Sequence, residues 1–242
     1  MQKVLRVVEK GKLSKFLETI AMVSDVCVVD LCSESGKLTA LTSSTDNTLI
    51  AYCELLNVDT NITTTLNLPD VKKLNRIIDS IPSDSIEFNL EGNNIQYNSP
   101  SLRFKYHLYE DGLLSAPNIS VNKVNSFDGD VTFELTREML NNIIKGSAFA
   151  SESNKVYFYT EGGEMKCELT DRSKHNTDAL SLTIGSTDLD LKPLPVNLDN
   201  IKLINMVSDV IKLKINTEYG IIIADVVDSD INLRYIITSL TQ

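Results

Sequence analysis

Histidine and cysteine are the side chains most often used for metal binding and catalysis, and this sequence contains few of them. It has two histidines, His107 and His175, and neither lies at metal-ligand spacing from a pair of cysteines. Cys27 and Cys32 fall on one predicted strand, at a separation that does not match a zinc knuckle. The pattern therefore predicts no metal site and no bound cofactor. The four irregularly spaced cysteines are expected to be reduced thiols in the core: Cys27, Cys32, Cys53 and Cys167.

An acid–base pair could form around His175, which Asp171 and Asp178 flank in the stretch DRSKHNTD. That stretch lies between two predicted strands, so a solvated loop is the simpler interpretation. Gly162 and Gly163 lie in a predicted hairpin and not before a helix, so they do not form a phosphate-binding loop. No nucleophile elbow or dinucleotide fingerprint is present. We therefore expect that the protein is not an enzyme.

Lysines and arginines on four predicted helices offer a different chemistry, which is sequence-independent contact with phosphate groups. The windows 12–22, 70–81, 136–147 and 198–208 hold eight basic and five acidic residues, so they carry +3 while the rest of the chain carries −13. Any surface helix can carry lysine and arginine for solubility. The bias indicates a binding face only if the fold gathers the helices on one side. The candidate phosphate-binding residues are Lys12, Lys15, Lys72, Lys73, Arg76, Arg137, Lys145 and Lys202.

Apolar residues recur at helical spacing in these four windows, and strand-like runs follow each of them. Asp70 and Thr136 stand where they can cap the second and third helices. A strand precedes each helix, and one strand, a tight turn and two more strands follow it. Glycine supplies the positive φ that such turns require. The turns contain Gly36, Gly92, Gly162 and Gly220.

The intervals between these four glycines, 56, 70 and 58 residues, indicate a duplicated architecture. The longer middle interval contains the weakly periodic stretch 111–130, which has the composition of a connector. Generic α+β domains also alternate helices and strands, but here the order recurs four times. We predict an α+β protein with two similar domains, 1–112 and 131–242, and a connector at 113–130. Each domain should hold two short helices packed on antiparallel sheets.

The composition limits where a polyanion could bind. The chain has 242 residues and a net charge of −10, which argues against a protein that coats nucleic acid with its whole surface. Its length suits two units that each bury a core. The sequence has no apolar run of membrane-spanning length and no signal-peptide pattern, so we expect a cytoplasmic protein without a membrane partner.

The order of elements resembles, over essentially the whole chain, the sliding-clamp family of DNA polymerase processivity factors. The length fits the two-domain branch, which includes proliferating cell nuclear antigen and the phage T4 clamp. The segment 12–55 resembles the opening helix and sheet of such clamps, and 233–242 resembles their closing strand and tail. The segment 160–185 is similar to the phage-type second domain. The resemblance thus points to a phage or viral member of the family.

The resemblance implies a homotrimeric ring that encircles duplex DNA, tethers the replicative DNA polymerase and is assembled by a clamp loader. The basic residues of the four helices would then face the DNA. The edge strand 102–109 would pair with the strand 179–184 of a neighbouring chain. The implied subunit interface contains Leu102, Phe104, Tyr106, Leu108, Leu180, Leu182 and Ile184.

The resemblance also implies an apolar pocket for partner proteins near the connector and the C-terminal tail. Strand alternation buries one residue of any adjacent pair, so core packing is an equal alternative for the two isoleucines of this set. The pocket residues are Leu113, Leu114, Ile119, Val121, Ile236 and Ile237.

Two other functions stay open. A monomeric processivity factor would need a more basic face than +3, and a non-ring β-rich viral structural or receptor-binding module would have no DNA function.

Overall fold

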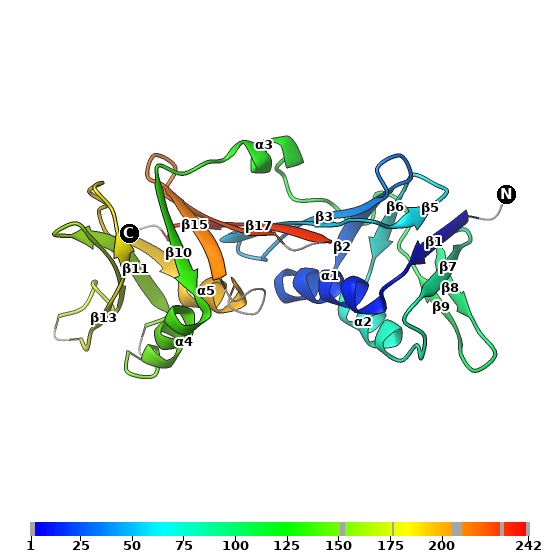
Figure 1. Ribbon diagram of the computed structural model, residues 1–242, viewed down its shortest axis with the longest axis horizontal. Helices are drawn as coiled ribbons and strands as arrows, with labels where there is room; N and C mark the ends of the chain where they lie inside the picture. Colours follow the sequence, from blue (N-terminus) through cyan, green and yellow to red (C-terminus); the bar gives the residue numbers. More distant parts are fainter. Residues whose placement is uncertain (1–2, 151–152, 176, 205–209, 228–229, 241–242) are drawn as a thin grey trace. The chain divides into compact units, whose positions relative to one another are not determined.

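The computed structural model describes residues 3–150, 153–175, 177–204, 210–227 and 230–240 (Figure 1). The chain divides into two compact units. The predicted domains are continuous segments, whereas each of these units also contains one short segment from the other half of the chain. The predicted connector is divided: its residues up to Val121 belong to the first unit and the rest to the second. The first unit holds Met1–Thr45, Ile50–Val121 and Val227–Leu233, and the second holds Asp46–Leu49, Asn122–Val226 and Arg234–Gln242.

The first unit contains two successive runs of strand, helix and three strands, with a short extra strand between them, as the repeat predicts. Its first run is β1 (Lys3–Val7), α1 (Lys10–Val23), β2 (Cys27–Cys32), β3 (Lys37–Ser43) and β4 (Leu49–Leu55), followed by the extra strand β5 (Asp59–Thr60). Its second run is β6 (Thr64–Leu68), α2 (Val71–Asp79), β7 (Ile86–Leu90), β8 (Asn94–Asn98) and β9 (Arg103–His107).

The second unit repeats this order after a short helix, α3 (Val121–Ser126), that the periodicity did not predict. Its first run is β10 (Val131–Thr136), α4 (Arg137–Gly146), β11 (Lys155–Glu161), β12 (Glu164–Leu169) and β13 (Leu180–Ser186). Its second run is β14 (Leu194–Asn197), α5 (Leu198–Ile204), β15 (Val210–Asn216), β16 (Ile221–Val227) and β17 (Ile231–Thr238). Residues 205–208 of the fourth predicted helix lie outside the described residues.

The two runs of each unit exchange their first strands. In the first unit β1 pairs with β7 and β6 pairs with β2, and in the second unit β10 pairs with β15 and β14 pairs with β11. All these pairs are antiparallel, and they give the sheet orders β5-β1-β7-β8-β9 and β13-β12-β11-β14. The four glycines of the predicted turns adopt φ between +54° and +61°, so the predicted hairpins are confirmed. Each unit is thus an internal duplication of one element order.

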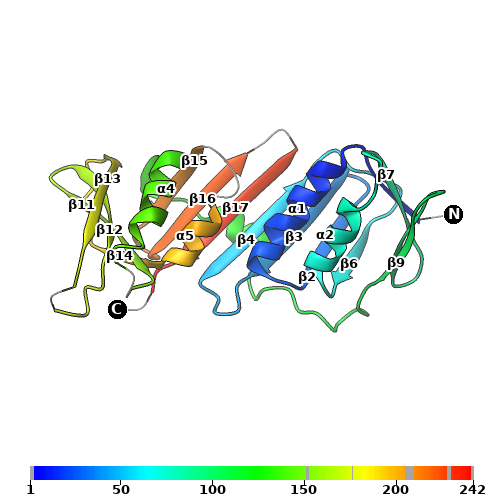
Figure 2. The ribbon, with the colours of Figure 1, turned by 90° about the horizontal axis from the view of Figure 1, so that it is seen from below.

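Each helix is positioned by its apolar face and, in two cases, by the predicted cap. Asp70 Oδ1 accepts a hydrogen bond from the Lys73 amide at 2.8 Å, and Thr136 Oγ1 accepts one from the Met139 amide at 3.2 Å. In Figure 2, α1 and α2 lie side by side in the first unit, and α4 and α5 do so in the second. None of the described helices is long and apolar enough to span a bilayer.

The core of each unit lies where its helices meet its sheets. In the first unit Phe16 and Ile78 are fully buried beside Phe88 of β7, and in the second Ile143 and Phe158 are fully buried. This packing removes the largest side chains of each unit from water and fixes the helices on the strands.

All four cysteines are free thiols, and three of them are buried as expected. Burial raises the pKa of the Cys27 thiol to about 12. Cys32 differs from the expectation: it is only half-buried, because it lies on the outward face of β2 with Val28 and Asp30. A side-chain hydrogen bond from Ser35 lowers the pKa of the Cys32 thiol. The alternation along the strand therefore accounts for its exposure.

Candidate nucleic-acid interface

The helix pair of the first unit is antiparallel and is held at both ends. The Val71 amide donates a hydrogen bond to the Asp25 carbonyl at 2.8 Å, which fixes the start of α2 beside the end of α1. At the other end, Ser14 Oγ donates to Asp79 Oδ1 at 2.6 Å. Lys10 Nζ donates to the Ile81 carbonyl at 2.5 Å and so covers the C-terminal end of α2. The polar faces of the two helices therefore form one rigid surface.

Lys12 and Lys72 on this surface are held by acidic neighbours. Lys12 Nζ lies 2.7 Å from Glu9 and 2.5 Å from Asp230, and hydrogen bonds to these two carboxylates, the one to Asp230 first, raise the pKa of Lys12. Lys72 Nζ lies 2.7 Å from Asp25, with both side chains more than half exposed. An exposed pair such as Lys72 with Asp25 contributes at most about 1 kcal/mol, so it can open in favour of another anion.

The remaining candidates of the first unit differ in exposure. Lys73 and Arg76 are exposed on consecutive turns of α2 and make no ion pair with any residue in the described ranges. Arg76 Nε donates to the Lys72 carbonyl at 3.3 Å, and the residue is exposed. Lys15 on α1 is half-buried. Lys73 and Arg76 are therefore the most accessible cations of the helix pair.

The second unit presents fewer basic side chains on its helices. Arg137 and Lys145 are exposed at the two ends of α4, whereas Lys202 on α5 pairs with Asp199 at 2.8 Å. Within the bounds of the four helices that the sequence predicted, α1 and α2 hold six basic and two acidic residues, and α4 and α5 hold three basic and two acidic residues. The helices thus carry +4 and +1, a sum of +5 that exceeds the predicted +3 because Lys10 lies inside α1 and Asp70 lies outside α2.

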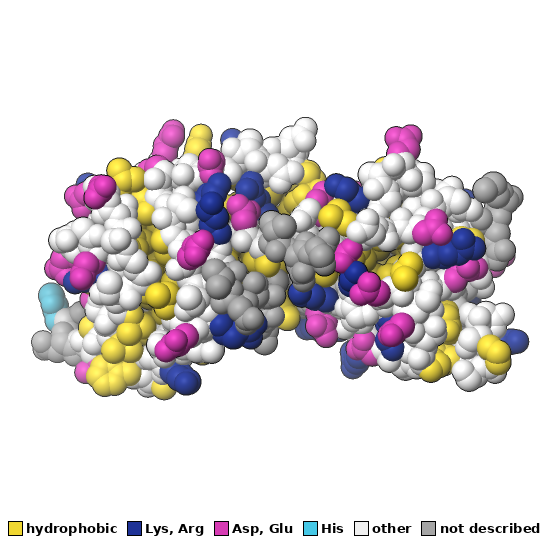
Figure 3. All heavy atoms as spheres, in the orientation of Figure 1, with side chains coloured by type: hydrophobic (Ala, Val, Ile, Leu, Met, Phe, Trp, Pro, Cys, Tyr) yellow, Lys and Arg dark blue, Asp and Glu magenta, His cyan; other side chains and the backbone are white. Residues whose placement is uncertain are grey.

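Basic and acidic side chains alternate elsewhere on the surface, as Figure 3 shows for one face. The positive bias is therefore a property of the helices, and it is concentrated on α1 and α2. The sequence windows predicted the bias but not its asymmetry between the two units, because they counted all four helices together.

Both predicted interface strands lie at edges of their sheets. Among the described strands, β9 ends the order β5-β1-β7-β8-β9, and β13 ends the order β13-β12-β11-β14. Each strand offers an unpaired row of backbone groups to which another strand could add. The half-buried residues of the predicted interface on these strands and beside them are Leu102, Phe104, Leu108, Leu180 and Leu182.

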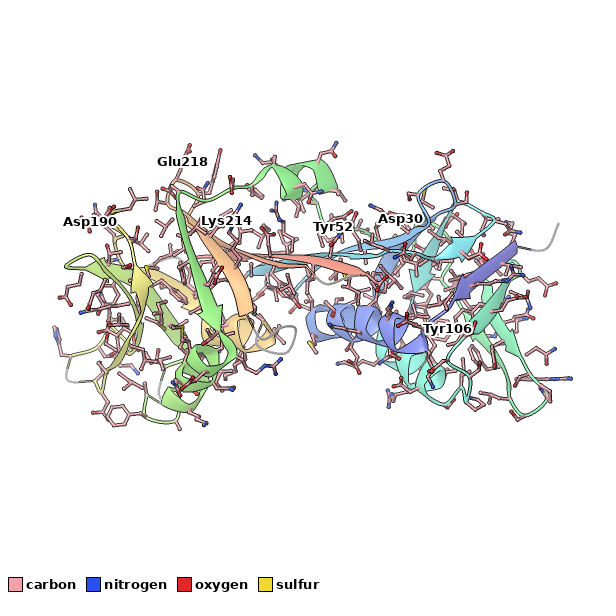
Figure 4. All side chains as sticks on the ribbon, in the orientation of Figure 1. Asp30, Tyr52, Tyr106, Asp190, Lys214 and Glu218 are labelled. Carbon is pink, nitrogen blue, oxygen red and sulfur yellow. The ribbon has the colours of Figure 1, made fainter. Side chains whose placement is uncertain are left out.

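Tyr106 and Ile184 belong to the core rather than to an exposed interface. Tyr106 is 4% exposed and points from β9 toward the start of α2 (Figure 4). Its hydroxyl donates to the Asp70 carbonyl at 2.7 Å and accepts from the Asp70 amide at 3.0 Å. Burial raises the pKa of Tyr106 to about 12. Ile184 is likewise buried, because alternation along an edge strand turns every second side chain inward.

The predicted partner pocket divides into exposed and buried residues. Leu113 is 66% exposed, and Leu114, Ile119 and Val121 are half-buried. The two isoleucines of β17 are both buried: Ile236 is 2% exposed and Ile237 is fully covered. The expectation that one of the pair would be exposed is therefore wrong, because both faces of β17 are covered here.

Helix α3 covers one of these faces through an arginine on β17. In Figures 1 and 2, α3 lies on the opposite side of β17 from α5. Arg234 Nη1 donates to the carbonyls of Val124, Asn125 and Phe127 at 3.1 to 3.3 Å. Its Nε and Nη2 bind the Asp225 carboxylate at 2.6 and 2.9 Å. This fork orients the guanidinium and satisfies the C-terminal carbonyls of α3.

Replacing Arg234 by methionine is expected to release α3 and the residue that follows it, and to lower the free energy of unfolding by about 2 kcal/mol. Methionine keeps the apolar stem but removes all five hydrogen bonds to the three carbonyls and to Asp225. Tryptic cleavage after Lys123, followed by mass spectrometry, should become faster. Arg172→Met is the matched control, because Arg172 also binds a carboxylate, that of Glu168 at 2.6 Å, on a different sheet. Equal cleavage after Lys123 in both variants would show that Arg234 does not hold this segment.

The residues that could have formed a metal or acid–base site do not converge. Among the described residues, no group of three or more His, Cys, Asp and Glu side chains is placed to bind a metal ion. His175 is exposed in the loop after β12, and the neighbouring Asp171 accepts from the amide and hydroxyl of Ser173 at 3.1 and 2.5 Å. These hydrogen bonds lower the pKa of Asp171. The loop is thus ordered by its own side chains, as the solvated-loop interpretation expects.

The architecture matches that of solved structures, although the sequence matches no known family. No protein-family model matches the sequence, and no curated protein matches it. Solved structures do match. A. fulgidus PCNA, solved with the C-terminal region of FEN-1 bound, superposes with a TM-score of 0.75 at 14% identity over 100% of this chain and 99% of its own. The Proliferating Cellular Nuclear Antigen of Entamoeba histolytica gives a TM-score of 0.75 at 13% identity, over 99% of both chains.

A bacterial clamp matches over part of its length. The Helicobacter pylori beta clamp gives a TM-score of 0.79 at 16% identity, and the match covers 100% of this chain and 67% of that one. These identities are too low to show more than the fold. The protein therefore has the α+β DNA-clamp fold, in the two-domain form that the PCNA structures share, and the predicted fold class is confirmed.

Proposed function

We propose that the protein is a sliding clamp: a homotrimeric ring that encircles duplex DNA and tethers a DNA polymerase without catalysing a reaction itself. The observation that carries the proposal is the clamp fold over the whole chain, combined with a helical surface of charge +4 in an acidic protein. A ring is held on DNA by its topology. Its contacts to phosphate can therefore be weak, salt-sensitive and independent of sequence, which permits sliding.

Closure of the ring would use the two edge strands. We infer that β9 of one chain adds to β13 of the next, with the half-buried apolar residues of both strands packed across the junction. Such head-to-tail pairing would also protect both edges from non-specific aggregation. Three copies of a two-domain chain would then form the ring.

The partner site is proposed along the connector. A. fulgidus PCNA binds the C-terminal region of FEN-1, and a polymerase or clamp loader would use a comparable short peptide here. Leu113 is the exposed apolar residue of the proposed site, Leu114, Ile119 and Val121 are half-buried, and Ile236 and Ile237 are buried. The predicted phage or viral source and cytoplasmic location stay predictions.

The mass in solution together with retention on circular DNA tests this function. We expect a species near three times the chain mass of 26.9 kDa. After loading on nicked circular DNA, the protein should remain bound through a gel-filtration column and should be lost once the circle is cut. A single-chain mass at micromolar concentration, with no retention on the circle, would instead support the β-rich module without DNA function. A single-chain species that binds DNA by charge alone would support the monomeric processivity factor.

A further inference from the structure

One face of the strands β15, β16 and β17 is polar at most positions but contains three buried isoleucines. The register of β15 and β16 puts Ile221 and Ile223 on the same face as Asp225. Arg234 of β17 binds Asp225 at 2.6 Å, so alternation along β17 places Ile236 on this face as well. The three isoleucines are 0 to 6% exposed. Another segment of the chain therefore covers them.

The covering segment consists of most of α3 and the residues that follow it, and we call residues 122–130 the strap. It crosses the face from β17 to β15. At β17 three carbonyls of the strap accept hydrogen bonds from Arg234, and at β15 the carboxylate of Asp128 binds Lys214 at 2.5 Å. In Figure 1 the strap lies on the side of these strands opposite α4 and α5. It is thus the cover of the polar face in the second unit.

The two ends of the strap are held differently. Helix α3 has six residues, too few to be stable alone, and it buries only Val124. At the other end, the Asp130 amide donates to the Ile215 carbonyl at 3.0 Å. The chain passes so close to β15 there that a Cβ on Gly129 would lie 2.7 Å from the same carbonyl oxygen. The strap can therefore open at α3 while its far end stays in place.

The contacts of α3 show what kind of ligand this face binds. Its one buried side chain is aliphatic, and carbonyls at its C-terminal end accept from the guanidinium of Arg234. Lys123 Nζ lies 4.9 Å from the ring centroid of Phe127 and 5.5 Å from that of Tyr219, which is 56% exposed. A guanidinium for carbonyl oxygens, an apolar surface and an aromatic ring for a cation together suit one turn of a helix with a basic residue.

We propose that α3 is a displaceable internal ligand, which occupies a seat that a partner protein fills with one helical turn carrying an aliphatic and a basic side chain. The seat consists of Tyr219, Ile223, Arg234 and Ile236. The inference rests on the proposed function only for the identity of the partner, a segment of a polymerase or clamp loader. The apparent affinity of that segment is lowered in proportion to the fraction of chains in which α3 is closed. The same contact accounts for the burial of Ile236, which was expected to line a partner pocket.

Thiol labelling measures the opening of α3 without DNA or a partner. Ile223→Cys places a thiol beneath the strap, where N-ethylmaleimide reaches it only when the strap opens. Cys167 is fully buried in the same unit and reports global unfolding in the same chain. Mass spectrometry of tryptic peptides should show faster labelling at position 223 than at Cys167. Equal rates would mean that α3 opens only when the whole unit unfolds, which overturns the proposal.

A charge under α3 should hold the strap open. In the Ile223→Cys chain, Val124→Asp should raise the labelling rate at position 223 at least about tenfold and leave Cys167 unchanged, because it would bury an unpaired carboxylate. Asn122→Asp is the matched control, since it adds the same charge at an exposed position of α3 and should label like the parent chain. Equal rates in the two variants would show that the Val124 contact does not close the seat. If Cys167 labelling also rises, the milder Val124→Ala should still accelerate labelling at position 223 alone.

A synthetic peptide with residues 120–128 of the chain tests the seat itself. At about millimolar concentration it should slow labelling at position 223 of the Val124→Asp chain at least about threefold, and the same peptide carrying Val124→Asp should not. Absence of protection would show that the face accepts no ligand in place of α3, and the seat would be wrong. A chain that forms no ring and is not retained on circular DNA would refute the proposed function, whereas the labelling results would stand.

Discussion

Replacing Lys72, Lys73 and Arg76 together by glutamine is expected to reduce affinity for duplex DNA on the order of 100-fold at about 0.1 M salt. Each lysine or arginine that binds a phosphate adds about 0.9 to the slope of log affinity against log salt, so removing three of them at once has a large effect. The three side chains are exposed on one face of α2, and glutamine is a good helix former, so the fold should persist. The measurements are duplex affinity over a salt series and retention on nicked circular DNA.

A matched control separates local contact from net charge. Lys105, Lys155 and Lys192 lie outside the helices, and their joint replacement by glutamine changes the net charge by the same amount. We expect that control to lose little affinity, because none of its charges lies on a helix. Equal losses in the two triple variants would mean that DNA responds only to overall charge, and the helical surface would then not be the binding face.

Replacing Lys105 by proline is expected to convert the proposed three-chain ring into single folded chains. The Leu108 amide donates to the Asn93 carbonyl at 2.8 Å, and the Ser99 amide donates to the Leu102 carbonyl at 2.9 Å. Even-numbered residues of β9 therefore exchange hydrogen bonds with β8, and by alternation the amide of Lys105 points to the open edge. Proline removes that donor and obstructs an added strand, while the pairing with β8 stays intact.

Light scattering and thermal melting check this second prediction. Lys105→Ala removes the same charge but keeps the amide, so it should retain the three-chain mass. Lys105→Pro should melt as a folded chain, at a lower temperature than the ring, because it loses the stabilisation of assembly. A three-chain mass in Lys105→Pro would show that the ring does not close through β9.

Much of the fold follows from local patterns in the sequence. The four helices, the caps at Asp70 and Thr136 and the positive φ of the turn glycines depend on neighbouring residues, which the sequence states directly. The two edge strands, in contrast, were expected from the resemblance to the sliding-clamp family and not from a local pattern. Helix α3 was not predicted, because its six residues lack a periodic apolar face and bury only Val124.

The candidate site was predictable in composition but not in arrangement. The basic residues of the helices were evident from charge, but the ion pairs of Lys12 with Asp230 and of Lys72 with Asp25 join segments that only the folded chain brings together. Ile236 and Ile237 looked like one exposed and one buried residue, and both are buried because a distant segment covers the second face of their strand.

The sequence by itself determined the element order, the duplication and the sign of charge on the helices, because each depends on spacing along the chain. The tertiary structure decided which side chains share a surface. It bound Arg234 to the carbonyls of α3 and concentrated the accessible cations on α2. These features depend on contacts between residues far apart in sequence, and periodicity fixes the apolar face of an element but not the neighbour that covers it.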